Sequence, residues 1–504
     1  MNEFDFLASL PSVAAPLGLA ILAFVVVLLD SYLPLVQRKN IAYVAGLGMV
    51  ALAAAPLIWS PPQGGATVWG GTLRHDATAQ IFQVMVMLAG GLTSLMAIRD
   101  HGTKNRGEFH LIVIVSTFGG TLLAASNDLI MLFIALETVT IPLYISAAFA
   151  RGDKRSSESG LKYFLFGSLA SAVLLYGFSL LFGFTGHTRL DLIAAALLEG
   201  RIIGDQILPL LMALLMVIVG FGFKVSMAPF HFWTPDVYEG SPTPVTAFVS
   251  VASKAASFAV LVRFMLNVFP AELTVDGQLV QSFWVNTLVV ISIISMTLGN
   301  VLALRQSNIK RLLAYSSIAQ AGYSLIGVAA LQAADPTFAV SSVAFYMFMY
   351  TFSNLLIFAC VIIFAEATGS EQIRDLAGLQ RRNPWMALAM TIGLLSLAGF
   401  PPAAGFFGKL FLFQASVDAG LVGLAVVGVL NSTVALYYYL VVIKIMYVDQ
   451  HPDQEKPISM MQPYNWVVGV ASLVVLLLGI LPTPIIDWAR TGAQSIALLL
   501  ISGF

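Results

Sequence analysis

The chain has 504 residues, of which 58% are hydrophobic and 10% are charged, and its net charge is −1. This composition excludes an ordinary soluble domain, and the balanced charge gives no reason to expect a nucleic-acid partner. The single cysteine, Cys360, excludes an intrachain disulfide and a cysteine-ligated iron–sulfur cluster.

Fourteen apolar segments are long enough to cross a membrane, because a spanning helix needs about 20 predominantly apolar residues. They cover residues 13–36, 41–60, 78–98, 109–126, 128–150, 159–185, 206–229, 244–268, 282–304, 310–332, 337–365, 385–417, 419–447 and 463–485. The N-terminus lacks the basic region of a secretory signal, so we expect the first segment to be retained as a span. The sequence therefore predicts an all-α polytopic membrane protein with about 14 transmembrane helices.

The loops on alternate sides of these segments differ in basic charge. The loops on the side reached after the first span carry Arg38, Lys39, Arg99, Lys104, Arg106, Arg151, Lys154, Arg155, Arg305, Lys310, Arg311, Arg374, Arg381, Arg382 and Lys456. The opposite side carries only Arg74, Arg189, Arg201, Arg263 and Arg490. The positive-inside rule then predicts that both termini lie outside, in the periplasm if the chain belongs to a bacterial inner membrane.

Lysine and arginine are distributed differently along the chain. Five of the ten lysines lie inside apolar segments, whereas the fifteen arginines lie outside these segments or at their ends. A charge in hydrocarbon is costly, so an intramembrane ionisable residue is a functional candidate. Lysine can lose its proton when it is desolvated, and arginine effectively cannot. This pattern favours a protein that moves protons.

Glu137 and Lys224 are two of these candidates. Glu137 lies about nine residues into the fifth span, near mid-depth, where a lone carboxylate must be protonated or paired. Lys224 lies in the seventh span, five residues before Pro229, which predicts a helix break just past the lysine. The pair either exchanges a proton or serves only as a structural ion pair between helices.

Lys409 lies seven residues beyond Pro401-Pro402, which predicts a second broken helix in the twelfth span. Broken helices at membrane depth mark ion sites in transporters that are built from inverted repeats. The two breaks are five spans apart, so their helices are antiparallel, as inversion requires. We therefore predict N-terminal helices 1–3 in residues 1–108, two inverted five-helix repeats in 109–270 and 281–450, and a last helix with a tail in 451–504.

The remaining intramembrane charges are weaker candidates. Lys254 is surrounded by small residues, which permit close helix packing and leave room for water. Lys162 is only three residues into its span, so snorkelling explains it almost as well as a function does. Snorkelling is the better interpretation for Lys444, and capping or pairing for Asp30.

One histidine and one polar segment complete the set of candidate site residues. His231 follows the break at Pro229 and either relays protons or only satisfies loop carbonyls. Residues 314–323 place hydroxyls and an amide inside the tenth span, where they either support a water chain between Lys254 and Lys409 or bond neighbouring helices. The sequence shows no metal-ligand spacing and no dinucleotide fingerprint, so we expect neither a metal nor a cofactor in this chain.

Three segments resemble those of a known family. They are KVSMAPFHFWTPDVYEGSPTPVTAF at 224–248, KRLLAYSSIAQAGY at 310–323 and GFPPAAGFFGKL at 399–410. These runs are similar to the proton-translocating, antiporter-like membrane subunits of respiratory complex I, the NADH:quinone oxidoreductase. The resemblance covers roughly residues 13–485. A lysine in the broken twelfth span is typical of two subunit types in this family, and the stretch after residue 490 is too short for the long lateral helix of one of these.

The resemblance implies roles for individual residues. Glu137 matches the glutamate that pairs with the lysine of the seventh span, Lys224. Lys254 matches the connecting lysine of the eighth span, and Lys409 matches the terminal lysine of the second half-channel. Lys162 matches a lysine that modulates the pair. Many relatives carry histidine where this chain has Gln320, so the link between Lys254 and Lys409 has to rely on water and hydroxyls.

The same resemblance implies which enzyme complex the chain belongs to, which partners it contacts and where the cofactors lie. The chain is expected to be a non-redox subunit of the enzyme, without catalytic chemistry of its own, in contact with other membrane-arm subunits and the lipid bilayer. FMN, iron–sulfur clusters and quinone are expected in other subunits. Two alternatives stay open: a Mrp-type or stand-alone cation/proton antiporter, which predicts sodium-dependent transport, and a non-conducting membrane scaffold.

Overall fold

The computed structural model describes residues 6–34, 37–59, 61–62, 64–98, 100, 102–103, 106–199, 207–269, 271, 273–275, 278–453, 455–460 and 463–501. Arg99, Lys104 and Arg201, which contributed to the predicted orientation, lie outside these residues.

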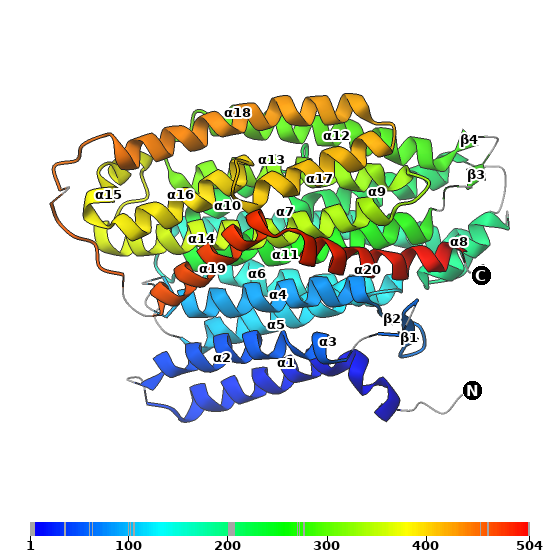
Figure 1. The fold of residues 1–504 in the computed structure, drawn as a ribbon. Coiled ribbons are helices and arrows are strands. Elements are labelled where there is room, and N and C mark those ends of the chain that lie inside the picture. Colours follow the sequence, from blue (N-terminus) through cyan, green and yellow to red (C-terminus); the bar gives the residue numbers. More distant parts are fainter. Residues whose placement is uncertain are drawn as a thin grey trace.

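Within the described residues, twelve helices are long and apolar enough to cross a membrane. Their axes run side by side along the horizontal direction of Figure 1. They are α1 (Phe6–Tyr32), α2 (Lys39–Leu52) with α3 (Ala55–Ile58), α4 (Ala77–Met96), α5 (Gly107–Ala125), α6 (Leu129–Ala147), α7 (Lys154–Thr185), α9 (Ile207–Val225), α11 (Thr243–Val268), α12 (Val280–Ala303), α13 (Ile309–Ala329) with the 3₁₀ helix η2 (Ala330–Gln332), α14 (Thr337–Thr368) and α18 (Val422–Tyr447).

Shorter elements connect or interrupt these helices. The helices among them are α8 (Leu190–Leu198), α10 (Thr234–Gly240), η3 (Ile373–Leu376), α15 (Leu379–Arg382), α16 (Pro384–Ala398), α17 (Ala404–Asp418), α19 (Tyr464–Ile480) and α20 (Thr483–Ile501). Two small antiparallel hairpins pair β1 (Ala66–Val68) with β2 (Leu73–His75) and β3 (Thr274–Val275) with β4 (Gln278–Leu279). The predicted all-α polytopic class is therefore confirmed.

The predicted breaks in the seventh and twelfth spans are both present. Helix α9 ends at Val225, and an irregular turn separates it from α10. The predicted span 385–417 consists of α16 and α17, which have 15 residues each and are separated by residues 399–403. Gly399 ends α16 with a φ of +85°, a backbone conformation that suits glycine.

A third break was not predicted. Helices α19 and α20 meet at an angle of 80°, so the predicted last span 463–485 ends at Ile480 and is followed by a second helix. Pro482 and Pro484 explain this bend, because proline cannot donate a backbone hydrogen bond and restricts the residue before it.

The predicted repeats, 109–270 and 281–450, remain a prediction. Helices pack against each other within both ranges, α5 on α6 and α7 on α9 in the first, and α12 on α13 and α17 on α18 in the second.

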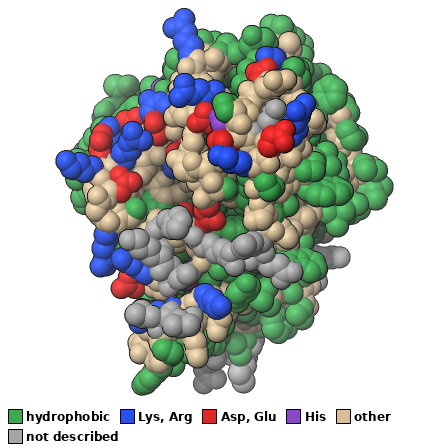
Figure 2. Space-filling view, turned by 90° about the vertical axis from the view of Figure 1, so that its left-hand side faces the viewer, with side chains coloured by type: hydrophobic (Ala, Val, Ile, Leu, Met, Phe, Trp, Pro, Cys, Tyr) green, Lys and Arg blue, Asp and Glu red, His purple; other side chains and the backbone are tan. Residues whose placement is uncertain are grey.

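Helices α11 and α14 form the centre of the bundle. The most apolar 18-residue stretch of each helix is entirely buried, and the two helices pack against each other. Charged side chains instead gather on the end of the molecule that Figure 2 shows, while apolar side chains cover its flanks. A polar residue within these buried stretches of α11 and α14 is consequently shielded from the surrounding medium by protein on all sides.

One arginine departs from the predicted distribution. Arg263, assigned above to the loop arginines, lies inside α11 and is fully buried. It binds Asp76 through two hydrogen bonds of 2.7 and 2.9 Å, and Arg74 Nε lies 3.1 Å from the same carboxylate. Burial alone raises the pKa of Asp76, but the two guanidinium groups, Arg263 first, lower it below its ordinary value. A fixed ion pair with Asp76, rather than exposure to water, therefore accommodates this arginine in the interior.

We expect Arg263→Met to reduce the free energy of unfolding by about 3–5 kcal/mol, because it leaves the buried carboxylate of Asp76 with only one cation. Thermal unfolding of the purified full-length chain in detergent measures this loss. Arg490→Met is the control, since Arg490 is half-exposed and its pair with Asp487 is 3.8 Å long. Equal unfolding temperatures for the two variants would contradict the structural role of the Asp76–Arg263 pair.

Candidate functional site

The structure brings Glu137 and Lys224 together. Lys224 Nζ lies 3.7 Å from Glu137 Oε1, and only 2% of the lysine side chain is exposed. Ser171 lies between them: its hydroxyl donates to Glu137 Oε1 at 2.6 Å and accepts from Lys224 Nζ at 3.1 Å. Tyr144 accepts a second hydrogen bond from Lys224 at 3.1 Å. The serine therefore offers a bridge for a proton between the ammonium and the carboxylate.

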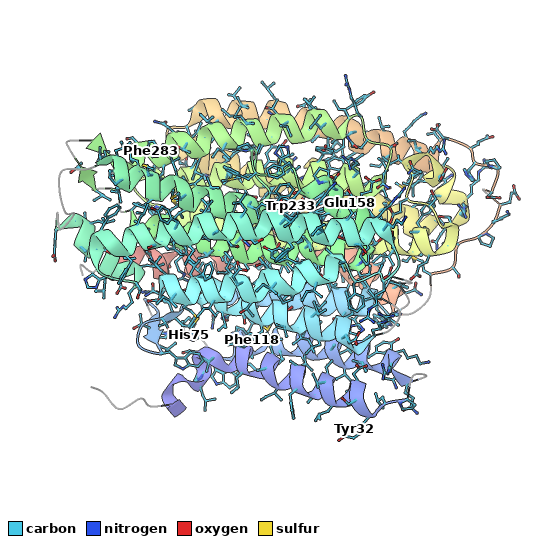
Figure 3. All side chains as sticks on the ribbon, turned by 180° about the vertical axis from the view of Figure 1, so that it is seen from behind. Tyr32, His75, Phe118, Glu158, Trp233 and Phe283 are labelled. Carbon is cyan, nitrogen blue, oxygen red and sulfur yellow. The ribbon has the colours of Figure 1, made fainter. Side chains whose placement is uncertain are left out.

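The helix break positions Lys224. The lysine occupies the last turn of α9, where free backbone carbonyls favour a cation. Met227 N then bonds Gly222 O, and Trp233 Nε1 donates to Phe223 O, so the chain after the break folds back on the end of α9. Trp233 lies in the interior of the bundle in Figure 3 and stacks on Tyr163.

Lys254 lies at the centre of α11 and contacts α13. Its Nζ donates to the carbonyl oxygen of Ser317 at 2.8 Å and also to the hydroxyl of the same residue. The Ser317 hydroxyl is further bonded by Tyr238 and Tyr350, each at 3.0 Å. All of these side chains are buried. Lys254 therefore belongs to a cluster of neutral hydroxyl groups.

Lys409 lies on α17 and points back to the end of α16. Its Nζ donates to Ala398 O and to Ser432 Oγ, both at 2.9 Å, and lies 4.5 Å from the ring centre of Tyr323. Ala398 O is one of the carbonyls that the end of α16 leaves without a helical partner. The break thus supplies the acceptor for the buried ammonium. Within the described residues, neither Lys254 nor Lys409 has a carboxylate partner.

Polar side chains join the surroundings of these two lysines. Ser316, next to Ser317, bonds the hydroxyl of Tyr439. Gln320 Nε2 donates to Tyr439 at 3.4 Å and to Leu397 O at 3.1 Å, and its Oε1 accepts from Tyr346. Leu397 O and Ala398 O, the acceptors of Gln320 and Lys409, are consecutive carbonyls. Residues 314–323 therefore do place hydroxyls and an amide between Lys254 and Lys409.

The other predicted site residues lie elsewhere. Lys162 is partly exposed and pairs with Glu158 and Asp236, each at 2.7 Å, rather than with Glu137 or Lys224. Figure 3 shows Glu158 farther toward the charged end of the bundle than Trp233. His231 lies in the turn after α9, and within the described residues no hydrogen bond or ion pair joins its side chain to the buried lysines.

Lys444 and Asp30 sit near the charged loops. Lys444 is 59% exposed and pairs with Asp449 at 2.6 Å, as snorkelling predicts. Asp30 pairs with Arg38 at 3.4 Å, as expected for a pairing residue.

Several site residues were missed in the sequence. Tyr144 follows Glu137 by seven residues on α6, and Tyr439 follows Ser432 by the same interval on α18, so each pair shares a helix face. Ser171 carries no comparable signal, because serine is common in membrane helices and nothing nearby in the sequence links it to Glu137. Within the described residues, no three His, Cys, Asp or Glu side chains gather in a way that holds a metal ion.

Comparisons with known proteins identify the family. The family described as "NADH:quinone oxidoreductase/Mrp antiporter, TM" matches residues 126–435. NADH-quinone oxidoreductase subunit N of Moorella thermoacetica is 40% identical over 482 residues, which cover 95% of this chain and 96% of the relative.

Two solved structures are also similar. A chain of respiratory complex I from Thermus thermophilus is 32% identical, with a TM-score of 0.76 over 95% of this chain and 100% of that chain. A chain of the Mrp complex from Dietzia sp. DQ12-45-1b shares the fold, with a TM-score of 0.81 at 20% identity over 98% of this chain and 100% of that chain. The family match and the identity along nearly the whole chain show that this protein belongs to the NADH-quinone oxidoreductase subunit N family of antiporter-like membrane subunits.

Proposed function

We propose that this chain translocates protons through two lysine-centred half-channels in the membrane arm of NADH:quinone oxidoreductase. The observation that carries the proposal is the Glu137–Ser171–Lys224 group, in which Ser171 and Lys224 are buried and 20% of the Glu137 side chain is exposed, because a carboxylate, a hydroxyl and an ammonium in hydrogen-bond sequence can exchange a proton. Lys254 and Lys409 extend the route beyond this first group.

The charge of Glu137 controls the first half-channel. An ionised Glu137 at 3.7 Å favours the charged form of Lys224, and a protonated or displaced Glu137 removes that support. Desolvation and repulsion from neighbouring ammonium groups then drive the proton from Lys224 toward the next acceptor. Redox chemistry in other subunits can therefore act on this chain through electrostatics alone.

Hydroxyl groups carry the second part of the route. Ser317, Ser316, Tyr439 and Tyr346 provide groups that both donate and accept hydrogen bonds between Lys254 and Lys409. Gln320 holds two of these tyrosines but cannot itself carry a proton as a charged intermediate. Transfer past Gln320 accordingly depends on hydroxyls and inserted water.

The family also supports the setting that we propose. The partners are other membrane-arm subunits and the lipid bilayer, and the chain lies in a bacterial inner membrane with both termini in the periplasm. FMN, iron–sulfur clusters and quinone belong to other subunits, and this chain contributes no redox or bond-breaking chemistry of its own. Lys162, through its pair with Asp236, modulates the first half-channel from the charged end of the bundle.

A Mrp-type cation/proton antiporter is the second candidate, because the Dietzia Mrp chain shares the fold. Sodium dependence of transport separates the two functions. The neutral surroundings of Lys254 and Lys409 favour proton transfer, since a sodium site prefers several hard oxygen ligands, carboxylates among them.

We expect Lys224→Met to lower proton pumping by at least about tenfold, because methionine keeps the volume of the side chain and cannot carry a proton. NADH:quinone reduction and acidification of inverted membrane vesicles are recorded together, after assembly of the complex has been verified. Lys444→Met serves as the control, since Lys444 is largely exposed and paired with Asp449. Pumping at the wild-type rate per electron in assembled Lys224→Met would refute the proposed route.

We expect Tyr439→Phe to lower the number of protons pumped per NADH by about twofold or more, because it removes the hydroxyl between Ser316 and Gln320. Tyr437→Phe is the matched control, as the neighbouring Tyr437 is 65% exposed. Gln320→His, which adds a titratable group at the same place, retains pumping. Equal ratios for the two tyrosine variants would remove Tyr439 from the route.

A further inference from the structure

A groove on the outer surface of the bundle lies between α12 and α18, and none of the buried lysines Lys224, Lys254 and Lys409 lines it. We call it the α12–α18 groove. It encloses about 310 Å³, and its walls include Leu304, Gln306, Arg374, Tyr437, Val441 and Ile445. The two helices pack beside each other at the top of Figure 1, and Ile373 and Arg374 of η3 also line the groove.

The groove is apolar along its length and polar at one end. Leu304, Tyr437 and Val441 are 42%, 65% and 38% exposed, so a large apolar surface remains uncovered. Tyr437 and Ile445 are eight residues apart on α18, which corresponds to about 12 Å along the helix. This length matches a substantial part of an extended acyl chain.

One cation, Arg374, lines the polar end of the groove, and two more, Arg305 and Lys444, are next in sequence to residues that line the groove. Arg374 is 86% exposed and lies 3.5 Å from Asp375, and Lys444 is 59% exposed with Asp449 as its partner. Arg305 lies between Leu304 and Gln306 and is exposed. Three cations and two acids leave an excess of one positive charge at the end of the molecule where the charged loops gather.

We propose that the α12–α18 groove binds an anionic phospholipid, with the acyl chain along α18 and the headgroup phosphate near Arg305 and Arg374. Basic pockets between membrane helices near the water boundary are typical sites for such headgroups. A free phosphate ion makes no use of the apolar wall, and a neutral lipid makes no use of the cations. The bound lipid would hold α18 in contact with α12 and η3. Helix α18 carries Ser432 and Tyr439 on its inward-facing side.

The test places a fluorescent label in the groove. Val441→Cys is labelled with bimane in the full-length chain, because the native Cys360 is 1% exposed and does not compete for the reagent. The chain is reconstituted into phosphatidylcholine vesicles with increasing fractions of dibromo-acyl phosphatidylglycerol or dibromo-acyl phosphatidylcholine. We expect the phosphatidylglycerol to reach half-quenching at a mole fraction about threefold lower than the phosphatidylcholine.

Two charge variants and a second label position provide the controls. Arg305→Gln with Arg374→Gln removes the headgroup preference, whereas Arg305→Lys with Arg374→Lys retains most of it. A label at Leu161→Cys on α7, which is 58% exposed and near the basic residues Lys154 and Arg155, reports only general attraction of anionic lipid to the surface.

Three results would overturn the proposal. The first is an equal preference for phosphatidylglycerol over phosphatidylcholine at Leu161→Cys and at Val441→Cys. The second is that the double glutamine variant retains this preference. The third is that neither lipid quenches the label when the labelled chain is part of the assembled complex. The last result would show that protein covers the groove. None of these measurements depends on proton transport, so failure here leaves the proposed function untouched.

Discussion

The need to supply partners for charged side chains inside hydrocarbon governs this structure. An ammonium group at membrane depth has lost its water, and its cost is reduced only by acceptors that the protein provides. Lys224 obtains a serine, a tyrosine and a carboxylate, Lys254 obtains the carbonyl and hydroxyl of Ser317, and Lys409 obtains Ala398 O and Ser432. The partners of the last two lysines are neutral, so these ammonium groups keep their hydrogen bonds without a fixed counter-charge. Arg263 is the opposite case, because its carboxylate partner, Asp76, locks it in place.

The helix breaks follow from the same requirement. An intact helix bonds its own carbonyls, whereas a broken helix leaves its last carbonyls free for a cation. Lys224 lies in the last turn before one break, and Lys409 donates to the last residue of α16 at the other. Gln320 uses the preceding carbonyl, Leu397 O, so the second break organises the polar line as well as the lysine. The prolines and Gly399 are thus part of the site, although none of their side chains has a titratable group.

Sequence alone predicted those features that a strong local rule determines. Span positions, the breaks at Pro229 and Pro401-Pro402, and the candidates Glu137 and Lys224 follow from hydropathy, proline chemistry and the cost of buried charge. The bend between α19 and α20 was missed because Pro482 and Pro484 were read as part of the apolar run 463–485 and not as a break within it. Ser171 and the pairing of Lys162 with Asp236 were missed for a different reason: they depend on which helices are neighbours, and composition does not determine this. Arg263 was placed among the loops because it lies near the end of its span, yet the neighbouring chain buries it completely.

The central claim is that Glu137 changes its protonation or hydrogen bonding as the enzyme turns over. Infrared difference spectroscopy of the assembled complex, on addition of NADH and quinone, tests this most directly. The account predicts a carboxyl band that disappears in Glu137→Gln and shifts in Ser171→Ala, because Ser171 donates to that carboxylate at 2.6 Å. A spectrum that is identical in wild type and Glu137→Gln, with pumping intact in both, would contradict the account.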